Sequence, residues 1–340
     1  MEEPRKDERF SFSVIIIGRN EGERLLRCIE SVRAMRGGFS PPEIVYVDSA
    51  SSDGSGDLAR KAGARVIELS SDNSSAAKGR NAGWKTAAGE YILFLDGDTI
   101  LAPDFVEKAR DVFKDPVVAA VAGDRREIFP QKNLFHRACD LEWITPYGER
   151  ESLGGDALIR RKVLEEIGGY EESLKVGEDP EMFSRIRQKG YKALHLNLPM
   201  TGHDLNMLTW GQYWQRAVRS GYAYAEVTDR FPGSVPESWK HVPRRNVFHA
   251  CLLLIVAVLA AAASFQRKDF LPLGLLFFVF LIMVLRRAYK EREKTKDIKT
   301  LLAYGIHVYL ATLPSLWGHA VYFWNKYRGL CATACPQRKA

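Results

Sequence analysis

A regular alternation of short apolar runs and amphipathic stretches constrains the fold of the first 125 residues most strongly. Apolar runs occupy residues 12–18, 43–48, 64–69, 91–95 and 117–123, and helical patterns fill residues 21–35, 56–63, 78–89 and 104–113. Strands that are buried on both faces and separated by helices predict a mostly parallel α/β sheet with helices on each side. Further along, residues 154–170 predict a short strand and a helix, and residues 177–190 predict another helix.

The C-terminal third is dominated by long apolar runs. Residues 247–265 and 270–285 contain no Asp, Glu, Lys or Arg, and a helix of about 20 apolar residues crosses a bilayer. Basic residues flank both runs, at Arg244, Arg245, Arg286, Arg287 and Lys290. We therefore predict a membrane-inserted helical hairpin, with a buried soluble hairpin as the alternative. A third uncharged run, residues 301–325, is interrupted by Gly305, Pro314 and Gly318, so it fits either a kinked span or an interfacial helix.

These patterns divide the chain into a polar tail (1–10), an α/β domain (11–204), a helical linker (205–246), membrane segments (247–325) and a basic tail (326–340). Charge asymmetry predicts a multi-pass protein of the cell membrane whose α/β domain is cytoplasmic. In the linker an apolar and aromatic stripe recurs every three to four residues, at Met207, Trp210, Trp214, Ala217, Gly221 and Ala225. The stripe fits either core packing or an interfacial helix, and the latter would bring Arg216 and Arg219 near headgroups or a substrate phosphate.

Net charge does not make this a nucleic-acid-binding protein. The formal charge is +7, but the first 200 residues carry no basic stripe interleaved with aromatic residues. Much of the excess lies beside the apolar runs, where a membrane protein carries it. We therefore expect no nucleic-acid partner.

Carboxylates follow two of the predicted strands. Asp48 ends the second strand and Asp53 lies in the turn after it, while Asp96 and Asp98 follow the strand 91–95. The Asp-Gly pair alone is a common hairpin signal. However, the carboxyl ends of parallel strands meet at one sheet edge, where ligands bind. Four carboxylates there repel one another unless a cation or hydroxyl donors lie between them, and hard divalent cations prefer oxygen ligands. We expect Gly97 to adopt an unusual backbone conformation that turns both aspartates to one side.

The ordered motifs "IIIGRNEGERLLRCIESV", "VDSASSDGS", "GRNAG", "LDGD", "GGDALIRR" and "GEDPEM" resemble those of bacterial family-2 glycosyltransferases with the GT-A fold. The resemblance covers roughly residues 10–225 and implies a nucleotide-sugar donor with Mn²⁺ or Mg²⁺. It implies donor contacts from Asn20, Glu21, Asp48, Asp53, Arg80 and Asp96. It implies metal ligation by Asp98 with Asp96, and in some relatives by a histidine in the region of His203. The acceptor or its phosphate would meet Gly155, Asp156, Glu178, Arg216 and Arg219.

In this family the segment matched by "GEDPEM" supplies the catalytic base, which would be Asp179, and direct displacement inverts the anomeric centre. A plain acidic helix start is the alternative for this segment. Processive synthases of the family carry Gln-x-x-Arg-Trp where this chain has "QYWQRAVR". We therefore expect single-sugar transfer to a lipid-linked or other membrane-proximal acceptor. A polysaccharide synthase subunit and a non-catalytic nucleotide-sugar-binding membrane protein remain alternatives. The absence of Gly-x-Gly-x-x-Gly after the first strand argues against a nicotinamide dehydrogenase.

Overall fold

The computed structural model describes residues 10–37, 40–71 and 74–330. Most of the 1–10 tail and residues 331–340 of the basic tail therefore lie outside the described residues. The strands are β1 Phe12–Gly18, β2 Glu43–Asp48, β3 Arg65–Glu68, β4 Tyr91–Asp96, β5 Thr99–Leu101, β6 Val118–Glu127, β7 Gly148–Glu149, β8 Ala157–Arg160 and β9 Lys192–His203. The helices of the α/β part are α1 Glu23–Arg33, α2 Ser55–Lys61, α3 Ala76–Thr86, α4 Phe105–Ala109, α5 Leu134–Trp143, α6 Arg161–Ile167 and α7 Glu178–Gln188.

These strands form one mixed sheet in the order β3-β2-β1-β4-β8-β6-β9-β5, with β7 paired to β9. Strands β1, β2, β3, β4, β6 and β9 run in one direction, and β5, β7 and β8 run against them. The predicted mostly parallel α/β sheet is therefore confirmed. Strands β5, β7 and β9 escaped the sequence analysis, because two are very short and β9 alternates in burial instead of forming an apolar run.

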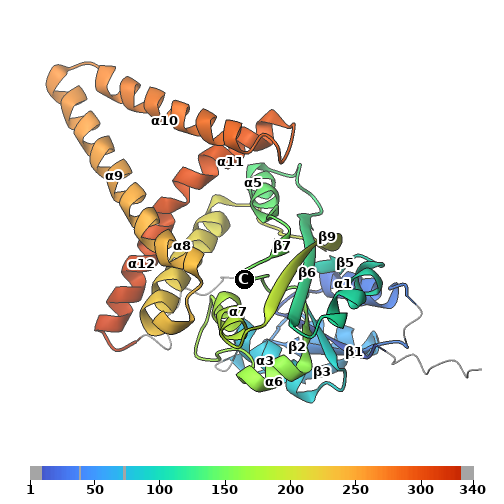
Figure 1. Cartoon of the computed structure of the whole chain (residues 1–340). Helices are drawn as coiled ribbons and strands as arrows, with labels where there is room; N and C mark the ends of the chain where they lie inside the picture. The colour runs from blue at the N-terminus through green and yellow to red at the C-terminus, as the bar shows by residue number, and fades with distance from the viewer. Residues whose placement is uncertain (1–9, 38–39, 72–73, 331–340) are drawn as a thin grey trace, which may run out of the picture.

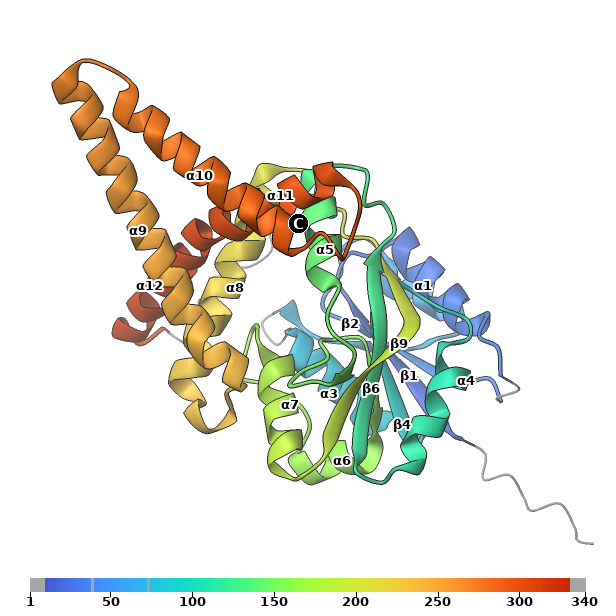
Figure 2. The same cartoon turned by 45° about the horizontal axis from the view of Figure 1, so that its top comes forward.

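Helices cover both faces of the sheet (Figures 1 and 2). Alternate residues of β1 enter different cores because successive strand side chains point to opposite faces. Val14 and Ile16 pack with Leu25 and Ile29 of α1, while Ile15 packs in the core that contains side chains of α3, α6 and α7. This double burial explains the uninterrupted apolar run in the sequence.

The Asp-Gly turn after β4 is not a hairpin. Strand β4 pairs with β1 and β8, whereas β5 pairs only with β9 among the described strands. The residues 96–98 thus carry the chain from the sheet centre to its far edge. The hairpin interpretation of this stretch is wrong, and the two aspartates lie at the carboxyl edge, where β1, β2, β6 and β9 also end.

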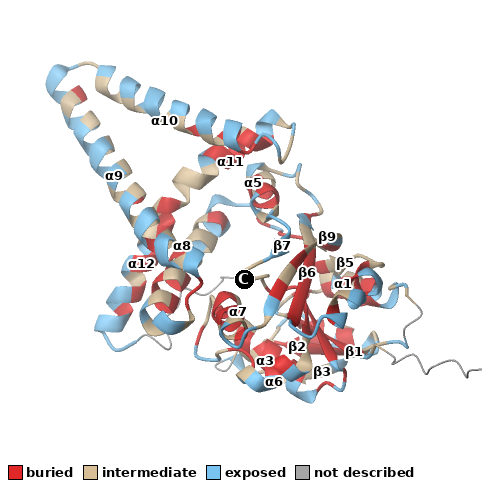
Figure 3. Ribbon diagram, in the orientation of Figure 1, coloured by how far each residue is buried: buried red, intermediate tan, exposed pale blue. Residues whose placement is uncertain are grey.

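The C-terminal helices are α8 Trp210–Arg230, α9 Glu237–Arg267, α10 Leu271–Lys290, α11 Ile298–Leu310 and α12 Thr312–Tyr327. Two of the described helices, α9 and α10, are long and apolar enough to cross a membrane by length and composition. Only 11% of the apolar window of each is buried, so the hairpin is not packed into the α/β core (Figure 3). The run 301–325 forms two helices that meet at Ala311 instead of one.

Helix α8 packs tightly against α12. A Cβ at Gly221 would lie 2.0 Å from the Ser315 carbonyl oxygen, and one at Gly318 would lie 2.1 Å from that of Val218. The two backbones therefore touch at these glycines, as in close helix packing through small residues. Part of the stripe predicted for the linker, including Gly221 and Ala225, is buried, while Trp210 is exposed.

We expect Gly318→Ala to lower the free energy of unfolding by about 1–3 kcal/mol, because the methyl group must push the two helices apart. Gly274→Ala is the matched control, since α10 offers open space at that position and alanine favours a helix. Thermal unfolding in detergent checks both. Equal midpoints for the two variants would show that the close contact contributes nothing.

Candidate functional site

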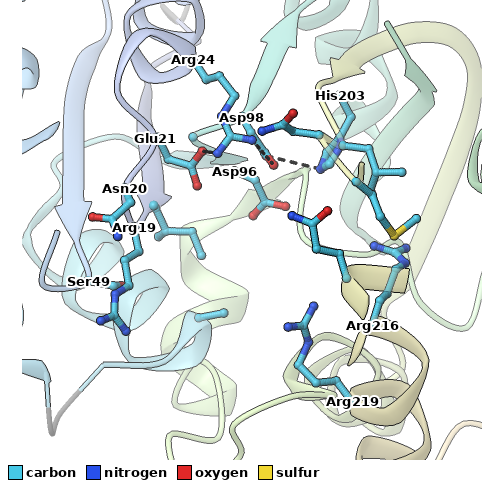
Figure 4. Close-up of a pocket in the computed structure, with 18 of the residues that line it drawn as sticks. Arg19, Asn20, Glu21, Arg24, Ser49, Asp96, Asp98, His203, Arg216 and Arg219 are labelled. Carbon is cyan, nitrogen blue, oxygen red and sulfur yellow. Dashed lines mark ion pairs between the residues drawn. The ribbon is translucent and has the colours of Figure 1, made fainter. Parts of the chain in front are cut away.

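A cavity of about 1180 Å³ opens at the carboxyl edge of the sheet and is closed on its far side by α8. Many polar and charged side chains line it, among apolar ones (Figure 4). Arg19, Asn20 and Glu21 come from the loop after β1, and Asp96 and Asp98 from the turn after β4. The other polar and charged lining residues are Arg24, Ser49, Ser74, Ser75, Arg125, Lys175, His203, Asn206, Thr209, Gln212, Gln215, Arg216 and Arg219.

Asp96, Asp98 and His203 form a group of ligand-type side chains in this cavity. One ligand atom from each lies within 4.8 Å of the others, and His203 Nε2 is 3.3 Å from Asp98 Oδ1. The pairing of β5 with β9 brings them together, because Thr99 is opposite His203 and the amide of Asp204 donates to the Asp98 carbonyl oxygen at 2.9 Å. Two carboxylates and one imidazole suit Mn²⁺, and the carboxylates also suit Mg²⁺.

The electrostatic surroundings of Asp98 favour a cation. Burial, together with the nearby carboxylates of Asp96 and Glu21, raises the pKa of Asp98 to about 8, although Arg125 and Arg24 oppose the rise. Arg24 Nη2 lies 2.6 Å from Glu21 and its Nη1 3.9 Å from Asp98. A bound divalent ion would stabilise the ionised form of a buried carboxylate that neighbouring negative charges otherwise destabilise.

Gly97 has a different role from the one expected. Its φ is not in the left-handed region that other glycines here occupy. Instead a Cβ at Gly97 would lie 3.0 Å from Glu21 Cγ and 3.3 Å from the Ile17 carbonyl oxygen. The glycine therefore lets the turn pass close to the loop after β1, without a positive φ.

The loop after β1 is tied to the loop after β2. Asn20, with φ of 57°, donates its amide to Ser51 Oγ at 2.8 Å, and its side-chain oxygen accepts from the Ser52 amide at 2.8 Å. Asp48 is buried, and Ser51 Oγ and the Tyr46 hydroxyl donate to it. A left-handed conformation costs asparagine less than most residues and is typical of functional loops.

Not every expected donor contact lines the cavity. Asn20, Glu21 and Asp96 line it, but Asp48 and Asp53 do not. Asp53 accepts the amide of Ser55 at 3.0 Å and its hydroxyl at 2.6 Å, an ordinary side-chain turn. In the described structure both residues shape the loop after β2, at the margin of the cavity.

Arg80 links the aspartate turn to the start of α7. Its guanidinium lies 3.1 Å from Asp96, 2.7 Å from Glu178 and 3.5 Å from Asp179. Burial alone would lower the pKa of Arg80, but the carboxylates raise it above its usual value. Arg80, Glu178 and Asp179 are not among the lining residues, so this network lies behind the Asp96 side of the cavity.

Asp179 combines burial with nearby charges of both signs. Burial raises its pKa to about 7, with Arg80 and Arg125 lowering it and Glu178 and Asp96 raising it. A carboxylate with a pKa near neutrality is suited to accept a proton at physiological pH.

Gly155 and Asp156 support the turn after β4. A Cβ at Gly155 would lie 2.2 Å from the Arg80 guanidinium. Asp156 is buried, and its carboxylate accepts from the Asp96 amide at 3.0 Å and from Thr201 Oγ1 at 2.9 Å. These contacts position Asp96, and neither residue lines the cavity.

Among the cavity residues that the sequence analysis missed, three lie against the Asp96–Asp98–His203 group. Arg24 lies one turn after Glu21 on α1, a spacing that could have suggested it. Arg125 is 3.4 Å from Asp96 and lies in the part of β6 that extends beyond the predicted run. Trp143 packs edge-on against His203, with ring centres 5.0 Å apart, and the Arg125 guanidinium lies 5.0 Å from the tryptophan ring centre. No sequence pattern marks Trp143, because only the fold brings α5 to the end of β9.

Comparison with known proteins identifies the family of this chain. The family model for glycosyl transferase family 2 matches residues 13–168, and that for glycosyl transferase family group 2 matches residues 91–316. Glycosyltransferase AglE of Haloferax volcanii is 25% identical over 76% of this chain and 84% of its own length. Poly-beta-1,6-N-acetyl-D-glucosamine synthase of Staphylococcus aureus is 24% identical over 66% of this chain and 60% of its own length.

A solved structure shares the fold. Mannosyltransferase PcManGT from Pyrobaculum calidifontis, in complex with GDP-Man and Mn²⁺, aligns with a TM-score of 0.60 and 21% identity over 88% of this chain and 87% of its own. The model that matches residues 91–316 covers most of the chain, including the aspartate turn and His203. The resemblance read from the motifs is thus confirmed, and the chain belongs to the family-2 glycosyltransferases.

Proposed function

We propose that this enzyme is a membrane-anchored, metal-dependent, inverting glycosyltransferase that moves one sugar from a nucleotide-sugar donor to a membrane-proximal acceptor. The observation that carries the proposal is the Asp96–Asp98–His203 group within a cavity rich in arginine. A fold relative bound to GDP-Man and Mn²⁺ supports it. Asn20 and Glu21 would contact the nucleotide, with Asp48 and Asp53 shaping the adjoining loop.

The donor set fits a divalent cation, because two carboxylates and an imidazole converge and burial raises the pKa of Asp98. When bound, Mn²⁺ or Mg²⁺ would act as a Lewis acid that neutralises charge on the leaving diphosphate. Arg24 and Arg125 hold Asp98 and Asp96 in place by their ion pairs. Arg216 and Arg219 supply positive charge from α8, on the opposite wall, to phosphate of the donor or the acceptor.

Asp179 would act as the base. As the acceptor oxygen attacks the anomeric carbon and the bond to the diphosphate breaks, the ionised Asp179 carboxylate would accept the proton of the acceptor hydroxyl. Asp179 acts as a base and not as a nucleophile. Displacement on the face opposite the leaving group inverts the anomeric centre. Arg80 would keep Asp179 and Glu178 aligned with Asp96 through its three contacts.

This assignment predicts how activity depends on pH. Because the pKa of Asp179 is raised to about 7, roughly one-tenth of it is ionised at pH 6 and about nine-tenths at pH 8. The base works only when ionised, so kcat/KM should rise about tenfold per pH unit below 7 and level off above it. A rate profile at saturating Mn²⁺ tests this, and a flat profile between pH 5.5 and 8 would contradict the role.

The decisive assay for the proposed function is a screen of the purified protein over common nucleotide sugars, with Mn²⁺, Mg²⁺ or chelator. Release of nucleoside diphosphate from one donor class, abolished by the chelator, is the expected result. Binding of a donor without any release, with or without acceptor lipids, would favour a non-catalytic binder instead.

A polysaccharide synthase subunit is the second candidate, because the Staphylococcus aureus relative is a poly-N-acetylglucosamine synthase. Two observations favour single transfer. The chain lacks the Gln-x-x-Arg-Trp sequence, and Gln212 at that place caps α8 by accepting the Thr209 amide at 3.0 Å. Product analysis separates the two candidates, since a synthase yields a ladder of lengths from one acceptor.

A further inference from the structure

Helices α11 and α12 cross the base of the apolar hairpin in a single bent line. In both views α12 crosses α9 near the end of α9 that adjoins α8, and α11 lies beside the end of α10 (Figures 1 and 2). The two hairpin helices are apart at this base and converge to meet at their far tip (Figures 1 and 2). Helices α11 and α12 therefore run across the direction in which the hairpin extends.

The contact of α11 with α10 indicates at which depth in a membrane the base of the hairpin would lie. A Cβ at Gly305 of α11 would lie 2.7 Å from the carbonyl oxygen of Val284 in α10. Val284 is next to the last residue of the uncharged run 270–285, and Arg286 and Arg287 follow directly. The contact thus falls where hydrocarbon-compatible sequence gives way to basic residues, which in a membrane protein is the headgroup level.

One side of α12 is apolar and exposed. At 3.6 residues per turn, Leu313, Leu316, Trp317, Ala320, Phe323, Trp324 and Tyr327 fall within about 120° of its circumference; we call this the aromatic face of α12. Its large rings are open to solvent, with exposed fractions of 60% for Trp317, 50% for Phe323, 61% for Trp324 and 86% for Tyr327. The opposite side, including Ser315, Gly318 and Tyr322, is buried, and Gly318 contacts α8.

We propose that α11 and α12 lie flat at the lipid–water boundary, with the aromatic face of α12 in the headgroup layer of the bilayer. Tryptophan and tyrosine concentrate at this depth because their rings are amphipathic. The partner is therefore a lipid surface, and residues 301–325 do not form a third span. This inference rests on the proposed membrane anchor and extends it.

The arrangement has a consequence for the acceptor. Helix α8 packs on the side of α12 that faces away from lipid and carries Arg216 and Arg219 on the cavity wall. The cavity would then lie directly beneath the membrane surface, one helix layer away from the lipid. A lipid-linked acceptor could present its head to the cavity without leaving the bilayer.

Spin labels in the full chain test the placement. In a background with Cys251, Cys331 and Cys335 replaced by serine, the buried Cys28 and Cys139 remain. Single cysteines are then introduced as Trp324→Cys or Tyr327→Cys. Matched references are Ile255→Cys in the exposed apolar part of α9 and Glu107→Cys on the surface of α4. Each labelled protein is reconstituted in phosphatidylcholine–phosphatidylglycerol vesicles.

Accessibility to oxygen and to a nickel chelate gives the depth of each label. We expect positions 324 and 327 at the headgroup level, roughly 5–10 Å into the boundary between headgroups and acyl chains, between the deep label at 255 and the aqueous label at 107. Aqueous values at 324 and 327, values as deep as at 255, or dipolar broadening from a second copy would each overturn the inference. Donor hydrolysis is not a readout here, so failure of the proposed activity would leave this result interpretable.

Discussion

Asp98→Asn should abolish release of nucleoside diphosphate, with a loss of about 10³-fold or more in kcat/KM. The neutral amide keeps the shape of the side chain but removes a charged ligand from a group whose atoms lie within 4.8 Å of one another. Mn²⁺ binding without donor, measured calorimetrically, should weaken in parallel. The variant should still fold, because a neutral side chain relieves both the burial of charge and the repulsion from Asp96 and Glu21 that raise the pKa of Asp98.

Asp104→Asn provides a matched control, because within the described part of the chain the Asp104 side chain makes only surface ion pairs, with Arg36 at 3.5 Å and Lys108 at 3.4 Å. Exposed pairs contribute about 0–1 kcal/mol, so this variant should keep wild-type activity and metal affinity. If Asp98→Asn behaved like Asp104→Asn, the aspartate turn would hold no catalytic metal, and the proposed mechanism would be wrong.

Asp179→Asn should separate donor binding from transfer. The affinity for donor and Mn²⁺ should change little, because Asp179 is not one of the three metal-ligand side chains and meets the acceptor in the proposed mechanism, whereas transfer should fall about 10³-fold. The rise in activity between pH 6 and 8 should disappear from whatever rate remains, since the titrating group is gone. Equilibrium donor binding and a transfer assay to an acceptor lipid measure the two effects separately.

Glu178→Gln is the informative neighbour. Glu178 makes the shorter contact with Arg80, 2.7 Å against 3.5 Å for Asp179, so its loss disturbs the same ion-pair network without removing the proposed base. We expect this variant to keep the pH profile and a larger share of the rate. A pH-independent rate in Glu178→Gln, together with a normal profile in Asp179→Asn, would exchange the two roles.

Much of the central fold could be predicted because local sequence and burial agree there. Strands β1, β2, β4 and β8, and the helices α1, α2 and α6 that follow β1, β2 and β8, overlap the predicted apolar and amphipathic stretches. A strand covered on both faces must be apolar throughout, and a helix that covers it must be amphipathic. The placement of Asp96 and Asp98 at the sheet edge follows from the same pattern, since Asp96 ends the buried strand β4 and Asp98 lies in the turn after it.

The tertiary structure alone decided how the site is assembled. His203 joins Asp98 only because β5 and β9 pair at the far edge of the sheet, and neither strand carries an apolar run. Arg125 reaches the cavity because β6 extends beyond the predicted apolar run. Trp143 reaches it from the end of α5, a helix that the alternation of strands and helices did not predict. Asp48 and Asp53 are hydrogen-bonded to serine side chains that follow β2, and the donor contact that the motif resemblance implies for them stays a prediction.

For the C-terminal part, the sequence by itself determined that two stretches are apolar enough to span a bilayer, because hydropathy and length are local properties. It did not determine the form of residues 301–325, which fitted both a span and an interfacial helix. Backbone contact at Gly305, Gly318 and Gly221 decided that these residues form two helices packed across α10 and α8. Such contacts depend on which distant segment presents a matching surface. The pattern of residues along one stretch of the sequence does not identify that segment.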